Sequence, residues 1–491
     1  MTEMALSRIV GQDLFVPPEW DRICRHLVLD SRDVNAGDLF VARAGSQARG
    51  QDYIAAALAA GAVAVLEEGE FGFRCEVGGV PVFSVPDLSA RLSGWLLRRY
   101  ATALELPLLA VTGTNGKSST VQYVAQLLSV LGKGCGVIGT TGNGVWPRLE
   151  PTRNTTPDLA TTLRMLETMQ EQGAMLAAME VSSHGLDQGR VAGLSFAVAA
   201  ITNITQDHLD YHGTMEAYEA AKWRLFSDYP LGQAILNIDD PRIAAMLAAV
   251  GTSVPGLTLS CHQAADIMIR EPSFSSGCMA ARLLTPWGEA VVTVPLIGGF
   301  NLVNAVMAIA MLAAAGLDFD ALVAAAATLR PVDGRMELYV RDGSPSVVVD
   351  FAHTPDALTT VMDALRPWNR PVTLVFGCGG ERDRGKRPLM TLAALAADQV
   401  WLTDDNPRRE DPDQIWADAL AVDGSERVQR EHDRRLAIRS ALVATAADGL
   451  LVIAGKGHEN YQEIAGVRHP YRDADVLQEL GYQRAGGGHV V

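Results

Sequence analysis

The stretch LPLLAVTGTNGKSS, residues Leu106–Ser119, decides the fold. Its first half is an apolar run typical of a buried β-strand, and a helical pattern, Val121–Leu131, follows its last residues. Between them lie Gly113 and Gly116, whose missing side chains let backbone N–H groups come close to a ligand. A strand that runs through a glycine-rich turn into a helix predicts a phosphate-binding loop, or P-loop.

The polar residues of this turn suit a nucleoside triphosphate. The helix N-terminus adds a favourable dipole, Lys117 adds a positive charge, and the Ser118 hydroxyl can ligate magnesium. The first glycine of the general P-loop pattern would fall at Val111, so this loop is a shortened variant. We therefore expect ATP and Mg²⁺ to bind here. The expected ATP-binding residues of the loop are Gly113, Thr114, Asn115, Gly116, Lys117, Ser118 and Ser119.

Further strand-like runs follow the loop and alternate with helical stretches. In the middle of the chain these runs are Met175–Glu180, Phe196–Asn203 and Ala234–Ile238. This alternation predicts a parallel sheet covered by helices. We expect a central, ATPase-like P-loop domain over residues 89–331, which ends in an alanine-rich helical region.

A domain is predicted on either side of the central one, which makes the whole chain an α/β protein. Short apolar runs before residue 88 predict a smaller N-terminal α/β domain, residues 1–88. After Pro331, four apolar runs each end in a polar loop, which predicts a Rossmann-like domain over residues 332–491. A length of 491 residues agrees with about three domains.

Composition excludes several classes of function. The net charge is −16, and no run rich in lysine or arginine is interleaved with aromatic residues, so we expect no nucleic-acid partner. The longest uninterrupted apolar run, Ala305–Leu317, is far shorter than the ~20 residues that span a bilayer. The N-terminus lacks the basic start and apolar core of a secretory signal. We expect a cytoplasmic monomer without membrane insertion.

The P-loop variant and a series of ordered motifs resemble the Mur ligase family over essentially the whole chain. The first half contributes Leu29–Arg32, Gly37–Val41, Asn154–Pro157, Met179–His184, Asn203–Tyr211 and Ala221–Trp223. The second half contributes Asn301, Asn304, Gly334–Arg335, Asp350–Pro355, Gly379–Asp383, Asp405–Arg408 and Gly455–Glu459. The resemblance implies an ATP-dependent carboxylate–amine ligase of peptidoglycan synthesis, and so a part in cell wall biogenesis, cell shape and cell division.

The resemblance also implies roles for residues around ATP. A carboxylate is a poor electrophile, so such ligases transfer the γ-phosphoryl group of ATP to it, and an amine then attacks the acyl phosphate. The implied catalytic residues are Lys117, Glu180, His208 and Lys222, and the implied magnesium ligands are Ser118, Glu180, His208 and Lys222. In similar ligases the lysine at the Lys222 position carries a carbamate derived from carbon dioxide, whereas the sequence alone reads it as a surface lysine of a helix. Asn304, Arg335 and His353 join the ATP-binding set by resemblance.

A second set of residues resembles the part that holds the UDP-sugar peptide. These are Leu29, Ser31, Ser46, Gln47, Ala48, Asn154, Thr155, Thr156, Ser182, Gln188 and Arg190. Hydroxyl, amide and guanidinium donors suit the anionic groups of such a substrate, although the Thr and Ser residues also suit helix capping. The chain departs from the family at Ser46, where a histidine is frequent, and at Phe351, where a tyrosine is usual. For Phe351 we favour packing in the core.

The stretch Asp405–Arg408, at the end of the strand-like run Gln399–Leu402, points to the amine. Arg408 offers a planar fork suited to a carboxylate, and diaminopimelate differs from lysine by one extra carboxylate. Relatives that add meso-diaminopimelate look like this. The residues expected to bind it are Arg382, Asp405, Asn406, Pro407, Arg408, Gly455 and Glu459.

The leading hypothesis is therefore the addition of meso-diaminopimelate to UDP-N-acetylmuramoyl-L-alanyl-D-glutamate through an acyl phosphate. A related ligase of the lysine-adding, dipeptide-adding or folylpolyglutamate type is the alternative. Asn406 with Arg408, and the sugar-binding first domain, weigh against it. A non-catalytic nucleotide switch is a third reading, which intact candidates for every catalytic part disfavour.

Overall fold

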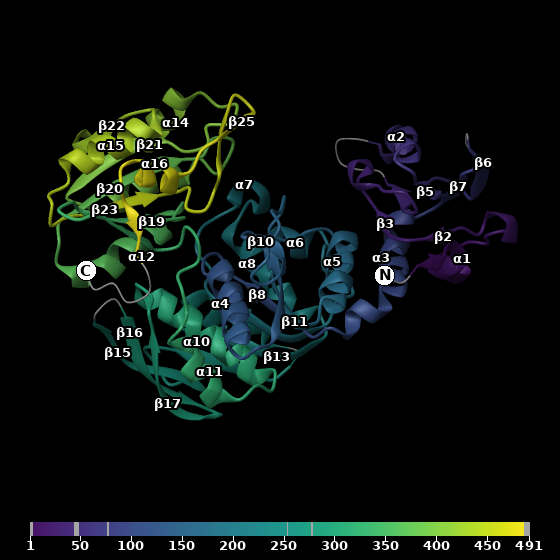
Figure 1. Cartoon of the computed structure of the whole chain (residues 1–491), viewed down its shortest axis with the longest axis horizontal. Helices are drawn as coiled ribbons and strands as arrows, with labels where there is room; N and C mark the ends of the chain where they lie inside the picture. Colours follow the sequence, from purple (N-terminus) through teal and green to yellow (C-terminus); the bar gives the residue numbers. More distant parts are fainter. Residues whose placement is uncertain (1–2, 44–48, 76–77, 253, 276–277, 486–491) are drawn as a thin grey trace. The chain divides into compact units, whose positions relative to one another are not determined.

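The computed structural model describes residues 3–43, 49–75, 78–252, 254–275 and 278–485. The chain divides into two compact units that we describe separately. The first comprises residues 1–110, 133–197 and 228–231, and the second comprises residues 111–132, 198–227 and 232–491. Each unit is α/β, in agreement with the predicted fold class (Figure 1). The predicted domain boundaries after residues 88 and 331 remain predictions.

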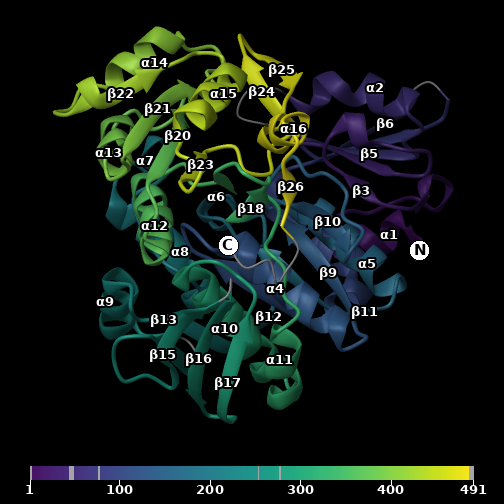
Figure 2. The same cartoon turned by 60° about the vertical axis from the view of Figure 1, so that its left-hand side comes forward.

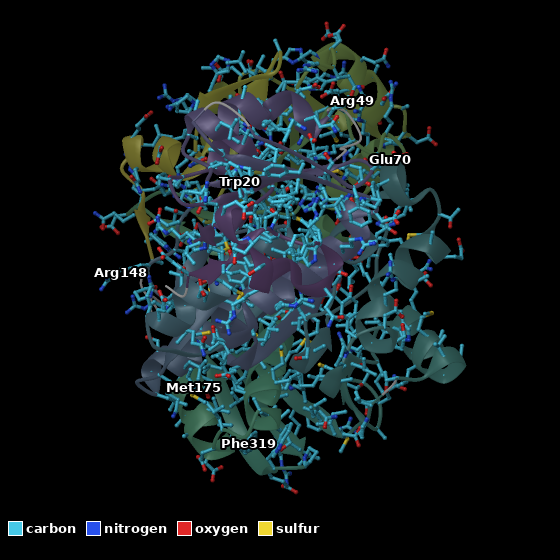
Figure 3. The ribbon with its side chains drawn as sticks, turned by 90° about the vertical axis from the view of Figure 1, so that its right-hand side faces the viewer. Trp20, Arg49, Glu70, Arg148, Met175 and Phe319 are labelled. Atoms are coloured by element: carbon cyan, nitrogen blue, oxygen red, sulfur yellow. The ribbon has the colours of Figure 1, made fainter. Side chains whose placement is uncertain are left out.

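The N-terminal part of the first unit is built on a small five-stranded sheet. Its order is β3 (Leu27–Val28), β4 (Leu39–Ala42), β5 (Ala64–Glu68), β7 (Pro81–Val85) and β6 (Gly72–Cys75). All neighbours pair in parallel except β6 with β7. Short β1 (Met4–Ala5) and β2 (Ile23–Cys24) pair separately, and the helices are α1 (Leu6–Val10), α2 (Ile54–Ala59) and α3 (Leu88–Arg99). Trp20, labelled in Figure 3, packs on Phe73 of β6 with ring centroids 5.3 Å apart.

The rest of the first unit carries strands in the order β10 (Gly142–Val145), β9 (Gly134–Gly139), β11 (Ala174–Glu180) and β8 (Leu108–Thr112). Its helices are α5 (Leu159–Glu171) and α6 (Ser183–Asp187). Arg99 at the end of α3 donates to Glu167 of α5 at 3.0 Å, with both side chains buried. This ion pair fixes α3 against α5, because separating its partners would leave a charge buried without compensation.

In the second unit, β8 leads through the P-loop into α4 (Lys117–Val130). From β8 the strand order is β12 (Phe196–Ile201), β13 (Leu231–Asn237), β14 (Gly256–Ser260), β15 (Ile267–Ser275), β16 (Cys278–Thr285) and β17 (Gly288–Val294). The helices are α7 (Leu209–His212), α8 (Met215–Ser227), α9 (Pro241–Val250), α10 (Gly299–Ala314) and α11 (Phe319–Ala326).

One part of this sheet departs from the predicted parallel arrangement. Strands β15, β16 and β17 form an antiparallel meander, which Figure 2 shows beside α10. The tight connection Thr285–Gly288 is a hairpin turn, and so short a link joins only antiparallel neighbours. The alanine-rich helical region is likewise two helices, α10 and α11, because Gly316 adopts φ 91° between them.

The C-terminal part of the second unit is a seven-stranded sheet. Its order is β22 (Val428–Arg430), β21 (Gln399–Asp404), β20 (Val372–Cys378), β23 (Leu450–Ala454), β19 (Ser346–Asp350), β18 (Glu337–Val340) and β26 (Gln483–Arg484). Strands β22 to β19 are parallel, and β18 and β26 add antiparallel edges. A hairpin of β24 (Tyr461–Ile464) and β25 (Val467–Pro470) lies outside the sheet.

Helices cover both faces of this sheet, as its alternating side chains require. Val348 and the same face of its neighbours pack with α12 (Pro355–Leu365), α13 (Lys386–Ala394) and α14 (Pro412–Ala419). Val347 and Val349 point to the other face and pack with α15 (Arg434–Ala444) and α16 (Asp473–Glu479). A strand buried on both faces reads as a continuous apolar run, which is why these strands were predictable. Among the described residues, no helix is long and apolar enough to cross a membrane.

Candidate active site

The P-loop conformation depends on its two glycines. Gly113 adopts φ 138° and Gly116 adopts φ 86°, both in the region that side chains disfavour. A Cβ atom at Gly113 would overlap the Thr202 hydroxyl, and one at Gly116 would lie 2.6 Å from Oδ1 of Asn304. The turn therefore needs glycine at both positions, and Asn304 lies directly beside it.

The polar groups of the loop leave a donor for a ligand. The Asn115 N–H donates to Oδ1 of Asn203 at 2.9 Å, which anchors the loop to the residues after β12. The Asn115 Nδ2 is buried and, within the described part of the chain, has no hydrogen-bond partner. Ser118 and Ser119 are buried in the first turn of α4. A buried amide donor without a partner beside glycine N–H groups fits a phosphate or nucleotide acceptor.

Two lysines donate to the same backbone carbonyl of the loop. Lys117 Nζ lies 2.8 Å from the Gly113 oxygen and 2.9 Å from the Thr114 oxygen. Lys222 Nζ, from α8, also lies 2.8 Å from the Gly113 oxygen, and its side chain is 1% exposed. Burial, and then the nearby Lys117 charge, hold the pKa of Lys222 well below its usual range. The interpretation of Lys222 as a surface lysine is wrong.

His208 belongs to a charged group that the sequence pattern did not reveal. Asp207 Oδ2 lies 3.4 Å from His208 Nε2 and 3.9 Å from His353 Nε2, and its Oδ1 lies 3.3 Å from Lys386 Nζ. Burial opposes ionisation of Asp207, but Lys386 and the two imidazoles hold its pKa below the usual range. Asp207 belongs to the motif Asn203–Tyr211, but it was not predicted as a site residue. Its position as an acidic residue in a loop after a strand was the signal that could have identified it.

Arg335 and two histidines pack around Phe351, which lies in the loop directly after β19. The Arg335 guanidinium lies 4.4 Å from the centroid of the Phe351 ring, which also packs on His353 and His458. Burial, and then the Lys386 charge, lower the pKa of His353 to about 4, so it is neutral at pH 7. Its Nδ1 must then carry the proton, because it lies 2.8 Å from the Phe351 carbonyl oxygen. Phe351 is only partly buried and lines a cavity rather than packing in the core, so the core-packing interpretation is wrong, and its ring instead supports the Arg335 guanidinium.

The residues expected to bind the amine come together at the ends of β20, β21 and β23. A cavity of about 160 Å³ is lined by Asp207, His208, Asp210, Phe351, His353, Gly377, Gly379, Arg382, Asp383, Lys386, Asp405, Asn406, Arg408, Gly455 and Glu459. Pro407 is the one expected residue of this set that does not line it, and a Cβ at Gly380 would overlap its carbonyl oxygen. This position beyond the carboxyl ends of parallel strands is where a Rossmann-like sheet binds ligands.

Backbone geometry sets the two ends of this cavity. Arg408 adopts φ 55°, and its Nη1 donates to the Gly380 carbonyl oxygen at 2.6 Å. Gly455 adopts φ 111°, and a Cβ there would lie 2.6 Å from Oδ2 of Asp405. A non-glycine residue in the left-handed region is uncommon, and such strain is typical of functional sites.

In the first unit, part of the expected sugar-peptide set lines a second cavity, of about 520 Å³. Leu29, Asn154, Gln188 and Arg190 are among its lining residues. Thr156 and Ser182 lie beneath them and are joined by a 3.1 Å hydrogen bond.

The remaining members of this set have varied surroundings. Thr155 receives a hydrogen bond from the Thr140 hydroxyl at 3.1 Å, and Ser31 begins a short 3₁₀ helix. Ser182 also caps α6 through the Gly185 N–H, as the capping interpretation expected. Ser46, Gln47 and Ala48 lie outside the described residues.

Glu180 ends β11 in the first unit, whereas the P-loop belongs to the second. Its carboxylate accepts from the Thr140 N–H at 2.7 Å and from the Thr140 hydroxyl at 3.3 Å. The predicted convergence of Glu180 with the loop therefore stays a prediction. No group of three His, Cys, Asp or Glu side chains arranged for a metal ion occurs among the residues that the structure describes.

Comparison with known proteins places these features in one family. Family models match residues 24–95 (Mur ligase family, catalytic domain), 111–312 (Mur ligase middle domain) and 334–457 (Mur ligase, glutamate ligase domain). The UDP-N-acetylmuramoyl-L-alanyl-D-glutamate–2,6-diaminopimelate ligase of Neisseria meningitidis serogroup A is 45% identical over 464 residues, 92% of this chain and 94% of its own. The ligase of the same name from Pseudomonas aeruginosa is 44% identical over 470 residues, 95% of this chain and 96% of its own.

Solved structures agree with this placement. One structure of a UDP-N-acetylmuramoyl-L-alanyl-D-glutamate–2,6-diaminopimelate ligase is 39% identical, with a TM-score of 0.65, and covers 97% of this chain and 98% of that one. A structure of MurF from Acinetobacter baumannii, 18% identical with a TM-score of 0.70, covers 92% of this chain and 96% of that one and shares the fold. On identity and coverage along nearly its whole length, the chain belongs to the Mur ligase family.

Proposed function

We propose that the residues assembled here carry out the reaction for which the relatives are named. The chain is an ATP-dependent ligase that joins meso-diaminopimelate to UDP-N-acetylmuramoyl-L-alanyl-D-glutamate in peptidoglycan synthesis, as the 44–45% identical relatives support. The observation that carries the assignment of residues is the cavity in which Arg382, Arg408 and Glu459 meet. Guanidinium groups and carboxylates in one cavity suit a molecule that has both carboxylate and ammonium groups.

The P-loop suits the ATP-dependent step. The glycine N–H groups, the free Asn115 Nδ2 and the Lys117 charge are placed to bind phosphate oxygens. Asn304 lies against the loop, and the Arg335–Phe351 stack adds a guanidinium supported on an aromatic ring. Binding of this kind aligns the γ-phosphoryl group with the substrate carboxylate, so that an acyl phosphate forms and the amine then displaces phosphate.

We propose magnesium as a further cofactor, with Ser118, Glu180 and His208 as its ligands. The Ser118 hydroxyl and the Glu180 carboxylate offer the oxygen atoms that this ion prefers. When bound, it stabilises the charge that develops on the transferred phosphoryl group. Lys222 is proposed to join them as a carbamate. Only a neutral amine attacks carbon dioxide, and the lowered pKa of buried Lys222 favours this neutral form. Carbamylation would also place an anion beside the Lys117 ammonium group, and the two opposite charges would attract each other.

The sugar peptide is proposed to bind in the first unit. Arg190 donates through Nη1 to the Thr156 carbonyl oxygen at 2.8 Å, and its Nη2 donates to Gln188 at 2.6 Å. These contacts hold a guanidinium at the edge of the cavity that Leu29 and Asn154 also line. A fixed guanidinium beside amide and hydroxyl groups suits the carboxylates of the dipeptide.

The proposal extends to the setting of the enzyme. We propose a cytoplasmic monomer whose product supports cell shape and cell division, because its substrates are cytoplasmic precursors of the wall. ATP, the sugar dipeptide and the diamino acid are its small-molecule partners. A folylpolyglutamate synthase of Mycobacterium tuberculosis is 19% identical, and the match covers 73% of this chain. At this identity the likeness shows a shared fold and does not support the folylpolyglutamate alternative.

The decisive experiment measures phosphate release from ATP with the sugar dipeptide, Mg²⁺ and either meso-diaminopimelate or L-lysine. We expect release that depends on the sugar dipeptide and is at least about ten-fold faster in kcat/KM with diaminopimelate. Mass spectrometry should identify the amide product. Faster release with lysine would assign the lysine-adding reaction instead. Nucleotide binding without any amine-dependent release would identify a nucleotide switch and overturn the proposal.

A further inference from the structure

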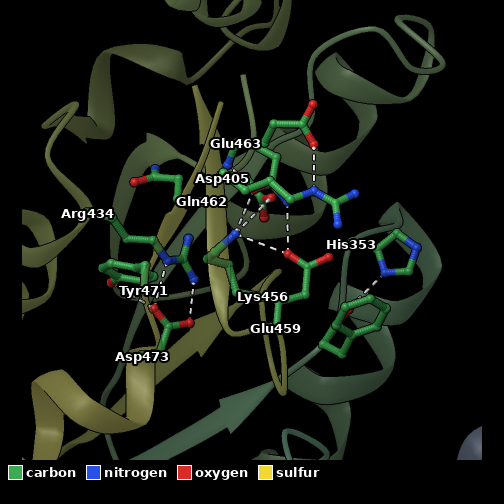
Figure 4. Close-up of polar contacts among 12 residues, drawn as sticks. His353, Asp405, Arg434, Lys456, Glu459, Gln462, Glu463, Tyr471 and Asp473 are labelled. Carbon is green, nitrogen blue, oxygen red and sulfur yellow. Dashed lines mark hydrogen bonds and ion pairs between the residues drawn. The ribbon is translucent and has the colours of Figure 1, made fainter. Parts of the chain in front are cut away.

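Lys456 contacts three of the residues that line the cavity, although it does not line the cavity itself and none of the predicted site sets contains it. Its side chain is 0% exposed, and Figure 4 shows it pointing between Asp405 and Glu459. The Nζ atom donates to Oδ1 of Asn406 at 3.0 Å and to Oε2 of Glu459 at 3.1 Å, and it lies 3.9 Å from Oδ1 of Asp405. Three of its neighbours are thus residues expected to bind the amine donor.

These contacts form a closed network. Asn406 Nδ2 donates to the same Glu459 Oε2 at 2.8 Å, and Asn406 Oδ1 also accepts from the Glu463 N–H at 2.9 Å. Lys456 and Asn406 therefore hold one oxygen of Glu459 and leave the other oxygen without a partner among the residues drawn in Figure 4. A carboxylate held by one oxygen presents its other oxygen in a fixed direction, which suits a substrate ammonium group.

The backbone that carries Lys456 is held just as firmly. Arg434 donates to both oxygens of Asp473 at 2.8 Å and to the Ala454 carbonyl oxygen at 2.9 Å, and all of these groups are buried. Gly455, the next residue, donates its N–H to the Asp350 carbonyl oxygen at 3.1 Å. On the other side, the Glu459 N–H donates to the Lys456 carbonyl oxygen at 2.9 Å. The Lys456 backbone is thus held on both sides, so its ammonium group acts from a set position.

Charge explains why a cation belongs here. Asp405 and Glu459 are two carboxylates close together in a partly closed cavity, and their mutual repulsion would be costly without a neighbouring positive charge. One ammonium group balances one of them. The pair then keeps a single negative charge, which matches one substrate ammonium group.

We propose that Lys456 is a positioning residue that orients Glu459 and Asn406 and leaves this end of the cavity with one unbalanced negative charge for the ammonium group of the amine donor. The inference rests on the proposed function, because it assumes that the amine donor binds in this cavity. It adds a determinant of specificity to that site. A donor with a second positive group at this end would find no carboxylate left to receive it.

The pH dependence of binding gives this role a distinctive signature. The groups that face Glu459 are Asp405, Lys456, Asn406 and Tyr461, with Arg382 and Arg408 on the cavity wall. Burial, and then Asp405, raise the pKa of Glu459, whereas Lys456 acts to lower it. Binding of an ammonium group needs ionised Glu459, so kcat/KM for the amine donor falls as the pH drops through this pKa. Removal of Lys456 raises the pKa further and moves this acid limb to higher pH.

The test compares Lys456→Met with Lys456→Arg and with Lys133→Met, which makes the same change at an exposed lysine of the first unit. Phosphate release gives KM for meso-diaminopimelate and for ATP across the pH range. For Lys456→Met we expect KM for diaminopimelate to rise roughly 30-fold, with less than two-fold change in KM for ATP. The acid limb of kcat/KM should move to higher pH. Lys456→Arg should keep the limb in place, because its charge remains, and Lys133→Met should match the wild type.

A double variant keeps the inference testable if the buried substitution lowers stability. Calorimetry measures diaminopimelate binding to Lys456→Met, to Glu459→Gln and to the double variant, each of which is first shown to be folded by its melting curve. If Lys456 acts through Glu459, Lys456→Met should weaken binding far less in the Glu459→Gln background than alone. Additive effects would contradict that link, as would equal rises in KM for ATP and diaminopimelate with an unmoved acid limb.

The two proposals fail in different ways. Wild-type protein that releases no phosphate with diaminopimelate defeats the proposed function. Wild-type protein that is active, together with a Lys456→Met variant that keeps its KM and acid limb, defeats this inference alone.

Discussion

Two buried lysines of the second unit meet opposite surroundings. Lys222 donates to the Gly113 carbonyl oxygen and lies 4.5 Å from the centroid of the Tyr218 ring, and no carboxylate pairs with it among the described residues. Lys456 is as deeply buried but bonds to a carboxylate, Glu459, and to an amide oxygen. Burial favours loss of the proton from Lys222, and no close carboxylate among the described residues opposes it.

The difference teaches that the neighbours of a buried lysine decide what it can do. A lysine beside carbonyl oxygens and another cation can give up its charge and become a nucleophile, as the lowered pKa of Lys222 indicates. A lysine bonded to a carboxylate and an amide oxygen, as Lys456 is, instead holds these side chains in place. One lysine is therefore suited to chemistry on its own nitrogen, and the other to holding its neighbours.

The largest effect is expected at Lys222, where substitution tests the contrast with Lys456 most directly. Lys222→Met should lower kcat by roughly 10³-fold. The variant cannot form the proposed carbamate, so magnesium would lose a ligand beside the transferred phosphoryl group. Lys222→Arg should be nearly as poor, since a guanidinium keeps its proton at neutral pH and forms no carbamate. Phosphate release measures both, and ¹³C NMR with labelled bicarbonate should show a carbamate resonance in the wild type only.

Lys133→Met again serves as the matched control, with unchanged kcat expected because that side chain is exposed. A Lys222→Arg variant that retained more than about a tenth of the activity would show that a positive charge suffices at this position. Lys222 would then resemble Lys456, and the contrast between the two lysines would disappear.

A smaller effect is expected at Arg408, which sharpens the comparison with a third cation. Within the described part of the chain, its Nη1 donates only to the Gly380 carbonyl oxygen, as Lys222 does to that of Gly113, but a guanidinium cannot lose its proton. It must therefore find its negative partner in the substrate. Arg408→Ala should raise KM for diaminopimelate roughly 30-fold and leave KM for ATP nearly unchanged, as phosphate release would measure.

Lysine as the amine donor provides the control for this position. Because lysine lacks the second carboxylate, its kcat/KM should change little in Arg408→Ala, so the preference for diaminopimelate should fall. Arg408→Lys should be intermediate, since the charge remains without the planar fork. A loss of equal size for both amines would mean that Arg408 supports the cavity rather than the extra carboxylate.

The sequence predicted those parts of the molecule that depend on neighbouring residues. The P-loop was predictable because strand, glycines and helix follow one another within Leu108–Val130. The parallel strands β19, β20, β21 and β23 were predictable because strands buried on both faces are continuously apolar. In each case the signal lies within one short stretch of chain.

Contacts between distant residues explain what was missed. Lys222 and Gly113 are 109 residues apart, and Lys456 and Asn406 are 50 apart, so the burial of either lysine follows from packing that no local pattern reports. The pairing of Asp207 with Lys386 joins residues 179 apart. The contact of Phe351 with Arg335 was missed for the same reason, because it depends on the close approach of Gly334 and Gly457. The assigned roles of all these residues still await the experiments above.

The smallest effect is expected at His432, where the same rule can be tested on an exposed cation. His432 Nδ1 lies 2.9 Å from Oδ1 of Asp404, its Nε2 lies 3.2 Å from Oδ1 of Asp413, and its ring stacks on Trp416. Burial acts to lower the pKa of His432, but the two carboxylates outweigh it and raise the pKa above its ordinary value. A raised pKa in the folded state stabilises the fold while the histidine is charged, fully below its unfolded pKa of about 6.5, and this gain is lost as the pH rises through the folded value. The His432 side chain is 45% exposed, so solvent screening keeps the effect small.

The measurement is the melting temperature as the pH rises from the unfolded to the folded pKa of His432. It should fall slightly in the wild type, and this part of the fall should be absent in His432→Gln. An identical pH dependence in both proteins would show that Asp404 and Asp413 do not stabilise the charged form of His432.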